Sequence, residues 1–126
     1  FCWILGQLRK KYPVKPKSKV KLRKTVEELF RKVSQHGVFN VLMSDVDHLY
    51  TFCNTKLYWL TRQTPFVEAQ LLDADLCVDF NQEASPDDVV TVIATEPLTS
   101  NEQWTKMETN EFSVFRLGVK TFTQVS

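Results

Sequence analysis

The spacing of the apolar residues changes once along this chain, and the change comes at Gly37. Before Gly37, apolar residues recur every three or four positions, which is typical of amphipathic helices. After it, they gather in short runs rich in aromatic and β-branched residues, which fit the pleated surface of a sheet. The sequence therefore predicts the α+β class, with two helices followed by mainly antiparallel strands.

Two helices are predicted ahead of Gly37. The first covers residues 1–12 and is ended by Pro13 and Pro16, because proline lacks the amide hydrogen that a helix needs. Ser18 is placed to cap the second helix, and Gly37 provides its left-handed stop. The apolar face of the first helix consists of Trp3, Ile4, Leu5, Leu8 and Tyr12, and that of the second of Leu22, Val26, Leu29, Phe30 and Val33.

Strands are predicted after Gly37. They cover residues 38–44, 48–53, 56–62, 67–72, 76–80, 88–95 and 112–117. The first three should form an antiparallel meander, since their connections are short, and the next two a hairpin around Asp73-Ala74-Asp75. The run over 88–95 is apolar on both faces, so Val89 to Thr95 is predicted to lie inside a sheet. Residues 119–126 are interpreted as a tail.

Length and composition predict one globular domain. With 126 residues, 43% apolar and 25% charged, the chain can bury a core and does not have the composition of a disordered protein. Its apolar runs are far shorter than the ~20 residues that cross a bilayer, so no membrane partner is expected. Three cysteines without a CxxC pair favour a reducing, cytoplasmic location over a disulfide framework.

The first residues predict that the sequence is a fragment of a longer chain. The stretch FCWIL is apolar, and no Met, basic segment or helix-capping residue stands before it. A secretory signal would place basic residues first and a small-residue cleavage site afterwards. A helix that starts within its own pattern, without a cap, is typical of a chain that continues upstream.

Charge is divided unevenly along the sequence. Residues 1–36 hold 11 of the 16 Lys and Arg residues and two acidic ones, a net charge of +9, while residues 37–126 have a net charge of −8. Such asymmetry is one mark of a nucleic-acid interface. The aromatics and glycines of an RNA-binding signature are absent. The favoured interpretation is therefore a basic helical layer on an acidic remainder, with no nucleic-acid partner.

No catalytic, cofactor-binding or metal-binding residue is predicted from residue spacing. His36 and His48 stand twelve positions apart, across a change from helix to strand, without a ligand partner at a useful spacing. The three glycines form no phosphate-binding loop, and no GxSxG elbow occurs. Aspartates in predicted turns are interpreted as solvated turn residues rather than a calcium loop: Asp45, Asp47, Asp73, Asp75 and Asp79.

The cysteines are predicted to be structural as well. Cys2 and Cys53 stand among apolar residues, where a free thiol usually serves as a small hydrophobe. Activation of a thiol needs a nearby cation, a helix N-terminus or a base. The sequence places no such partner beside Cys2, Cys53 or Cys77.

Several segments of the sequence resemble a known family. They are GVFNVLMSD over 37–45, WLTRQTPF over 59–66, and DDVVTVIATEPLT over 87–99 with NEQW over 101–104. Together they resemble the C-terminal half of the small bacterial class II glutamine amidotransferase-like proteins, the YafJ-like group. The opening Phe1-Cys2-Trp3 is similar to the helix that follows an acidic T-D-S-E segment in that family.

This resemblance implies an N-terminal nucleophile hydrolase fold, a four-layer αββα sandwich in which two antiparallel sheets face one another between helices. It implies glutamine as the substrate and no cofactor. The thiol of an N-terminal cysteine attacks the side-chain amide, a glutamyl thioester forms, and ammonia leaves. In the family, an arginine and an acidic residue hold the substrate, and an Asn-Gly pair supplies the oxyanion hole.

None of these catalytic residues can be carried over to this sequence. Residue 1 is Phe1, no Asn-Gly pair occurs, and no motif identifies Arg62 as the substrate-binding arginine. We therefore expect residues 1–126 to be the C-terminal portion of a single amidotransferase domain. That portion should be inactive by itself, since the nucleophile would lie upstream.

The residues inside the resembling motifs are predicted to have structural roles. Pro97 should stop the strand after Thr95, and Trp104 should cover a sheet end. Thr95 or Thr99 should bond turn backbone, and Glu96 is interpreted as a capping or turn residue rather than a binding residue.

A second interpretation remains open, in which the chain is a stand-alone, non-catalytic α+β interaction module. Its basic helices would then bind an acidic partner. The amidotransferase interpretation differs in predicting that the isolated fragment self-associates, because half of a two-sheet sandwich leaves sheet edges and apolar surface uncovered.

Overall fold

The computed structural model describes residues 1–65, 69–72, 77–79 and 85–126. Its two helices are α1 (Cys2–Lys11) and α2 (Lys19–Ser34), in the order and places that the sequence predicts. Ser18 caps α2 as predicted, since its hydroxyl oxygen accepts a hydrogen bond from the Lys21 backbone N–H at 3.4 Å. Among the described residues, no helix is long and apolar enough to cross a membrane.

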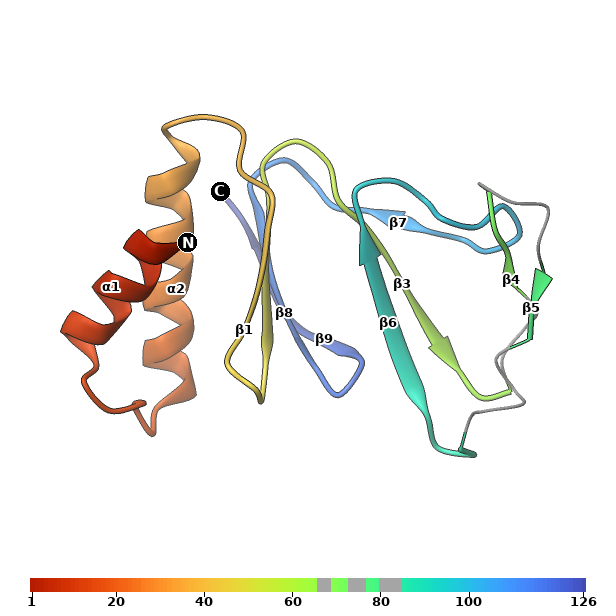
Figure 1. Ribbon diagram of the computed structural model, residues 1–126, viewed down its shortest axis with the longest axis horizontal. Helices are drawn as coiled ribbons and strands as arrows, with labels where there is room; N and C mark the ends of the chain where they lie inside the picture. Colours follow the sequence, from red (N-terminus) through yellow and green to blue (C-terminus); the bar gives the residue numbers. More distant parts are fainter. Residues whose placement is uncertain (66–68, 73–76, 80–84) are drawn as a thin grey trace.

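The first sheet has four antiparallel strands and packs against the helices. Its order is β1-β2-β8-β9, with β1 at Val41–Ser44, β2 at Leu49–Cys53, β8 at Glu111–Arg116 and β9 at Val119–Val125. The pairing of β2 with β8 sets Phe52 opposite Phe112 and so joins segments far apart in the sequence. Figure 1 shows both helices on one side of this sheet.

The second sheet lies on the other side of the first. Its order is β6-β3-β7, with β3 at Tyr58–Gln63, β6 at Val89–Ala94 and β7 at Thr105–Lys106. Beyond it, β4 (Ala69–Gln70) and β5 (Cys77–Val78) form a small hairpin. The layers seen in Figure 1 are thus helices, sheet and sheet, which agrees with an αββα sandwich in three of its four layers.

The main core lies between α2 and the first sheet. Phe30 is fully buried there and meets Phe52 and Phe112 edge to face, with ring centroids 6.5 and 6.0 Å apart. Arg31, the next residue of α2, also fixes the helix to the sheet, because its guanidinium donates to the backbone oxygens of Asn110 at 3.1 Å and Gln124 at 3.4 Å. This half of the molecule is therefore held by aromatic packing and by bonds to the sheet backbone.

A smaller apolar cluster joins the two sheets. Cys53 and Phe115 from the first sheet are buried with Leu57 and Met107, and Trp59 of β3 packs edge to face on Phe115 at 5.6 Å. At the end of β8, the Thr91 hydroxyl of β6 donates to the Gly118 carbonyl oxygen at 2.6 Å. The two sheets consequently contact one another through few apolar side chains.

Three predictions about strand arrangement are wrong. The first three strands do not form a meander, because β3 leaves β2 and pairs with β6 and β7 in the other sheet. The β6 strand lies at an edge of the second sheet, with Val90 45% exposed, and does not lie inside it. Residues 119–126 are not a tail, since β9 pairs along β8. The predicted hairpin is confirmed at β4 and β5, and residues 67, 68, 73–76 and 80 lie outside the described ones.

Candidate functional site

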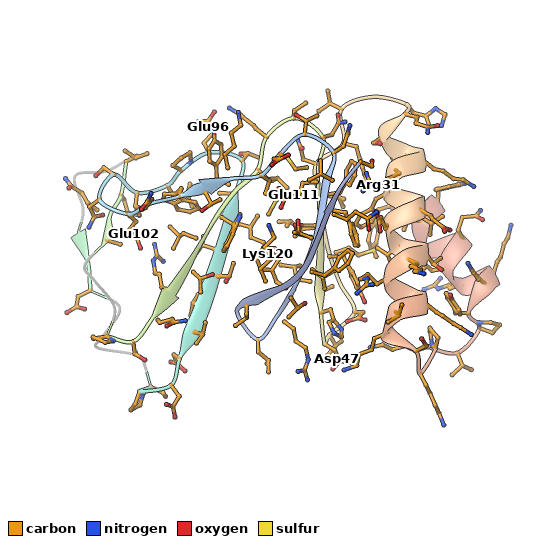
Figure 2. The ribbon with its side chains drawn as sticks, turned by 180° about the vertical axis from the view of Figure 1, so that it is seen from behind. Arg31, Asp47, Glu96, Glu102, Glu111 and Lys120 are labelled. Carbon is orange, nitrogen blue, oxygen red and sulfur yellow. The ribbon has the colours of Figure 1, made fainter. Side chains whose placement is uncertain are left out.

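A layer of polar side chains lies between the two sheets, on the face of the first sheet that points away from the helices. Thr51 and Ser113 are fully buried there, and Glu111 is 6% exposed. The Glu111 carboxylate accepts hydrogen bonds from the Ser113 hydroxyl at 2.7 Å and the Lys120 ammonium at 2.5 Å. Figure 2 shows Glu111 and Lys120 close together in the middle of the molecule.

The Glu111 carboxylate is held in its ionised form. Burial by itself would raise the pKa of this group. Hydrogen bonds from Lys120, from the Glu108 backbone N–H and from Ser113 outweigh burial, and the pKa of Glu111 lies below its ordinary value. A carboxylate with so many donors is a poor proton acceptor, so Glu111 serves as an anchor between β8 and β9 rather than as a general base.

A second polar network joins the motifs on which the family resemblance rests. Arg62 of β3 donates from Nε to Glu102 Oε2 at 2.7 Å and from Nη2 to Oε1 at 2.5 Å. The Thr99 hydroxyl donates to Glu102 Oε1 at 2.8 Å and accepts from Trp104 Nε1 at 2.9 Å. The two charged side chains are 14% and 12% exposed. Strand β3 and the segment over 99–104, which are distant in the sequence, therefore meet in one largely buried, charge-assisted network.

This network revises the predicted role of Thr99. The sequence indicated that its hydroxyl would bond turn backbone, but it lies between the carboxylate of Glu102 and the indole of Trp104. The hydrogen bond from Arg62 is the main reason that the pKa of Glu102 lies below its ordinary value. Beside the network lies a groove of about 500 Å³ whose lining includes Trp59, Arg62 and Gln103.

The cysteines occupy different environments. Cys53 is fully buried, as predicted, and burial raises the pKa of its thiol, which keeps it protonated and unreactive. Cys2 stands at the start of α1 and is exposed, so the prediction that it packs as a small hydrophobe is wrong. The backbone of Cys77 belongs to β5, and its side chain lies outside the described residues.

The aspartates of the β1–β2 turn are structural, as predicted. Asp45 Oδ1 accepts from the backbone N–H of His48 at 2.7 Å, and its Oδ2 accepts from the Tyr50 hydroxyl at 2.9 Å. Asp47 pairs with Lys15 at 3.0 Å. The described residues contain no group of three or more His, Cys, Asp or Glu side chains that could hold a metal ion. Asp73 and Asp75 lie outside them.

Glu96 takes part in a surface ion pair. Its carboxylate lies beside the Lys56 ammonium, so the end of β6 is tied to the residues just before β3. This contact lowers the pKa of Glu96. The pair is exposed, and the contact agrees with a turn-stabilising role.

Comparison with known proteins places the whole chain in one family. A family model described as "Glutamine amidotransferases class-II" matches residues 1–126. A protein of Escherichia coli (strain K12) named "Putative glutamine amidotransferase YafJ" is 45% identical over 118 residues, covering 94% of this chain and 46% of that protein. A "Putative glutamine amidotransferase" of Haemophilus influenzae is 35% identical, covering 95% of this chain and 40% of that protein.

A solved structure has the same fold. It is "The 2.0 Angstrom crystal structure of predicted glutamine amidotransferase from Pseudomonas aeruginosa PA01", which superposes with a TM-score of 0.81 at 46% sequence identity. The match covers 95% of this chain and 47% of that one. The chain thus spans less than half the length of the relatives that it matches.

Proposed function

The chain belongs to the class II glutamine amidotransferase family, and from this premise we propose that it forms the C-terminal portion of one amidotransferase domain of the N-terminal nucleophile type. The reaction of the complete domain is the hydrolysis of glutamine to glutamate and ammonia. The match of the family model to all 126 residues carries this proposal. The partial coverage of the relatives supports the view that a further portion completes the domain.

Glutamine hydrolysis requires a nucleophile and oxyanion donors that residues 1–126 do not contain. A class II enzyme uses a cysteine whose free α-amino group accepts the thiol proton while the thiolate attacks the amide carbon of glutamine. In this chain the nitrogen of Cys2 is bonded to Phe1, and Cys53 is buried as a thiol. No Asn-Gly pair is available in the sequence to stabilise the oxyanion. We therefore propose that residues 1–126 alone are inactive.

The contribution of this chain is then the scaffold behind the site. The first sheet is fixed to α2, and the Arg62–Glu102 network fixes β3 to the segment that follows β6. Catalytic groups must be held within a fraction of an ångström, and rigid sheets do this better than loops. The second interpretation, a stand-alone module for an acidic partner, is not favoured, because the family match leaves no part of the chain unassigned.

Ammonia and glutamate release from glutamine tests the proposal. We expect no turnover by residues 1–126, turnover by the full-length protein, and its loss when the N-terminal cysteine of the full-length protein is changed to alanine. Cys53→Ala in the full-length protein is the matched control, and it should keep turnover because that thiol is buried away from solvent. Turnover by residues 1–126, or a full-length protein that is active without its N-terminal cysteine, would contradict the proposal.

A further inference from the structure

A small pocket lies between the first turns of α2 and the first sheet. Its volume is about 210 Å³, and its polar lining residues are Lys19, Arg23, His48, Tyr50 and Thr121. Pockets for drug-sized ligands occupy roughly 300–1,000 Å³, so this one suits a smaller molecule. None of the described Asp or Glu residues lines it. The pocket thus combines cationic and hydroxyl groups with the apolar side chains of Val20, Val114 and Phe122.

The orientation of the Arg23 side chain is fixed by an aromatic contact in this pocket. Its guanidinium carbon lies 3.7 Å from the centroid of the Phe122 ring, so the planar group is stacked on that ring. Arg23 also lines the pocket. A planar guanidinium fixed by stacking presents its donors to a planar or tetrahedral oxyanion in a defined geometry.

The charges around Arg23 favour an anion. Lys19 stands one turn earlier on α2, and His48 lines the pocket from the first sheet. Asp45 lies behind His48, with 3.5 Å between Asp45 Oδ1 and His48 Nδ1 and without hydrogen-bond geometry. Its carboxylate is already engaged by the Tyr50 hydroxyl and by the nearby Lys15 ammonium. The field inside the pocket is therefore set by the two permanent cations, Lys19 and Arg23.

The first turn of α2 has an unusual charge for a helix N-terminus. A helix N-terminus carries partial positive charge and usually has acidic residues in its first turn. The first turn of α2 has none, and Lys19, Lys21, Arg23 and Lys24 crowd the same end. Like charges so arranged destabilise a helix. A bound anion would offset this repulsion.

We propose that this pocket binds a phosphate group, either as inorganic phosphate or as the monoester of a small molecule. Two permanent cations match the charge of a phosphate dianion better than that of a single carboxylate. The planar Arg23 guanidinium, stacked on Phe122 in the pocket lining, provides the directional contact. Lys19 provides a second charge, and His48 adds a donor from the sheet. The inference stands on these residues and is separate from the glutaminase proposal.

Calorimetric titration of the full-length protein at constant ionic strength tests the proposal. Inorganic phosphate and glycerol phosphate are the two probes, and acetate is the control anion. We expect saturable binding of a phosphate probe, and no saturation with acetate. The tighter of the two phosphate probes then identifies the source of the group. Equal, unsaturated binding of all three anions would overturn the proposal.

Two substitutions at Arg23 locate the binding. Arg23→Met removes the charge, and Arg23→Lys keeps the charge but loses the planar guanidinium and its stack on Phe122. Each should weaken phosphate binding by about tenfold or more, because the planar, charge-assisted donors of the guanidinium are lost. Lys24→Met is the matched control, since it removes one charge from the exposed side of the same helix, and it should change the affinity less than about twofold.

The same variants can overturn the proposal in two ways. An equal loss in Arg23→Met and Lys24→Met would show that general attraction, and not this pocket, holds the anion. Unchanged binding by Arg23→Lys would show that the planar guanidinium has no part in it. The unfolding midpoint of each variant is measured alongside, and Arg23→Lys remains decisive if Arg23→Met does not fold.

Discussion

At the scale of single residues, we expect the loss of the Arg62–Glu102 pair to lower the free energy of unfolding most. Both side chains are largely buried, and the Thr99 hydroxyl donates to Glu102 while it accepts from the Trp104 indole. Breaking one partner of a buried pair leaves a charge without compensation, which costs more than the pair itself contributes. The network is thus expected to resist substitution, because its loss would destabilise the fold.

Glu102→Gln should lower the free energy of unfolding by about 2–3 kcal/mol at neutral pH, measured by urea denaturation. The pKa of Glu102 is lowered in the folded state, so its stabilisation is complete above the ordinary value of 4.5. It is lost as the pH falls through the lowered pKa. The difference between wild type and variant should therefore shrink in acid.

Glu28→Gln is the matched control for that measurement, because Glu28 is exposed on α2 and makes no ion pair among the described residues. It should change the free energy of unfolding by less than about 0.5 kcal/mol. An equal effect of the two substitutions, or a difference that grows in acid, would contradict the assigned role of Glu102.

Single-residue roles could be predicted where local sequence decides them. Cys53 in an apolar run is buried, and Asp45 and Asp47 build a turn, as predicted. The prediction for Cys2 is wrong because apolar neighbours in the sequence do not show which side of a helix faces the core. In α1 the buried residue is Ile4, and Cys2 is exposed. The network around Glu102 could not be found, since 40 positions separate its carboxylate from Arg62.

At the scale of elements, the β8–β9 turn is held against β6 by close backbone contact. Gly118 has φ of +74°, and a Cβ atom there would lie 2.4 Å from the Val89 carbonyl oxygen. Neither the backbone conformation nor the space suits a side chain. Gly6, inside α1, has no atom within 4 Å of the same added atom.

Gly118→Ala should lower the free energy of unfolding by about 2–4 kcal/mol, because it adds conformational strain to a clash with backbone. Gly6→Ala should instead raise it by about 0.5–1 kcal/mol, since alanine is the better helix former. Urea denaturation of both variants measures whether the two substitutions change the free energy of unfolding in opposite directions. A stabilised Gly118→Ala would mean that the turn is not pressed against β6.

Elements could be predicted from periodicity, and their partners could not. The helices have regular apolar spacing, so α1 and α2 were found with nearly correct ends. The sequence pattern does not reveal β9, because β9 is an edge strand of mostly polar residues. Of its side chains, Phe122 packs against the main core. The apolar run of β6 resembled a central strand, but apolar character does not reveal which strand pairs on each side.

At the scale of the whole molecule, exposed sheet edges predict self-association of the 126-residue chain. In the described part of the chain, β6 and β1 each pair with one strand, and Val90 and Leu42 on them are 45% and 46% exposed. Open edges with apolar side chains invite pairing between molecules. We expect the apparent mass from light scattering to rise with concentration.

Val90→Lys should reduce this association, because a charge on an edge strand opposes pairing with another chain. Val14→Lys is the control, since Val14 is 82% exposed in the connection between the two helices and belongs to no strand. It should leave the concentration dependence unchanged. A mass that stays monomeric at every concentration in the unsubstituted chain would contradict the expectation.

The polar layer between the sheets has a consequence for how the molecule opens. Edge-to-face aromatic contacts hold α2 on the first sheet, whereas that sheet meets the second sheet through Thr51, Ser113 and the Glu111–Lys120 pair beside a small apolar cluster. The second sheet should therefore detach as a cooperative unit while the first stays folded. Amide protons of β3 and β6 would then exchange with deuterium together, well before those of β2 and β8.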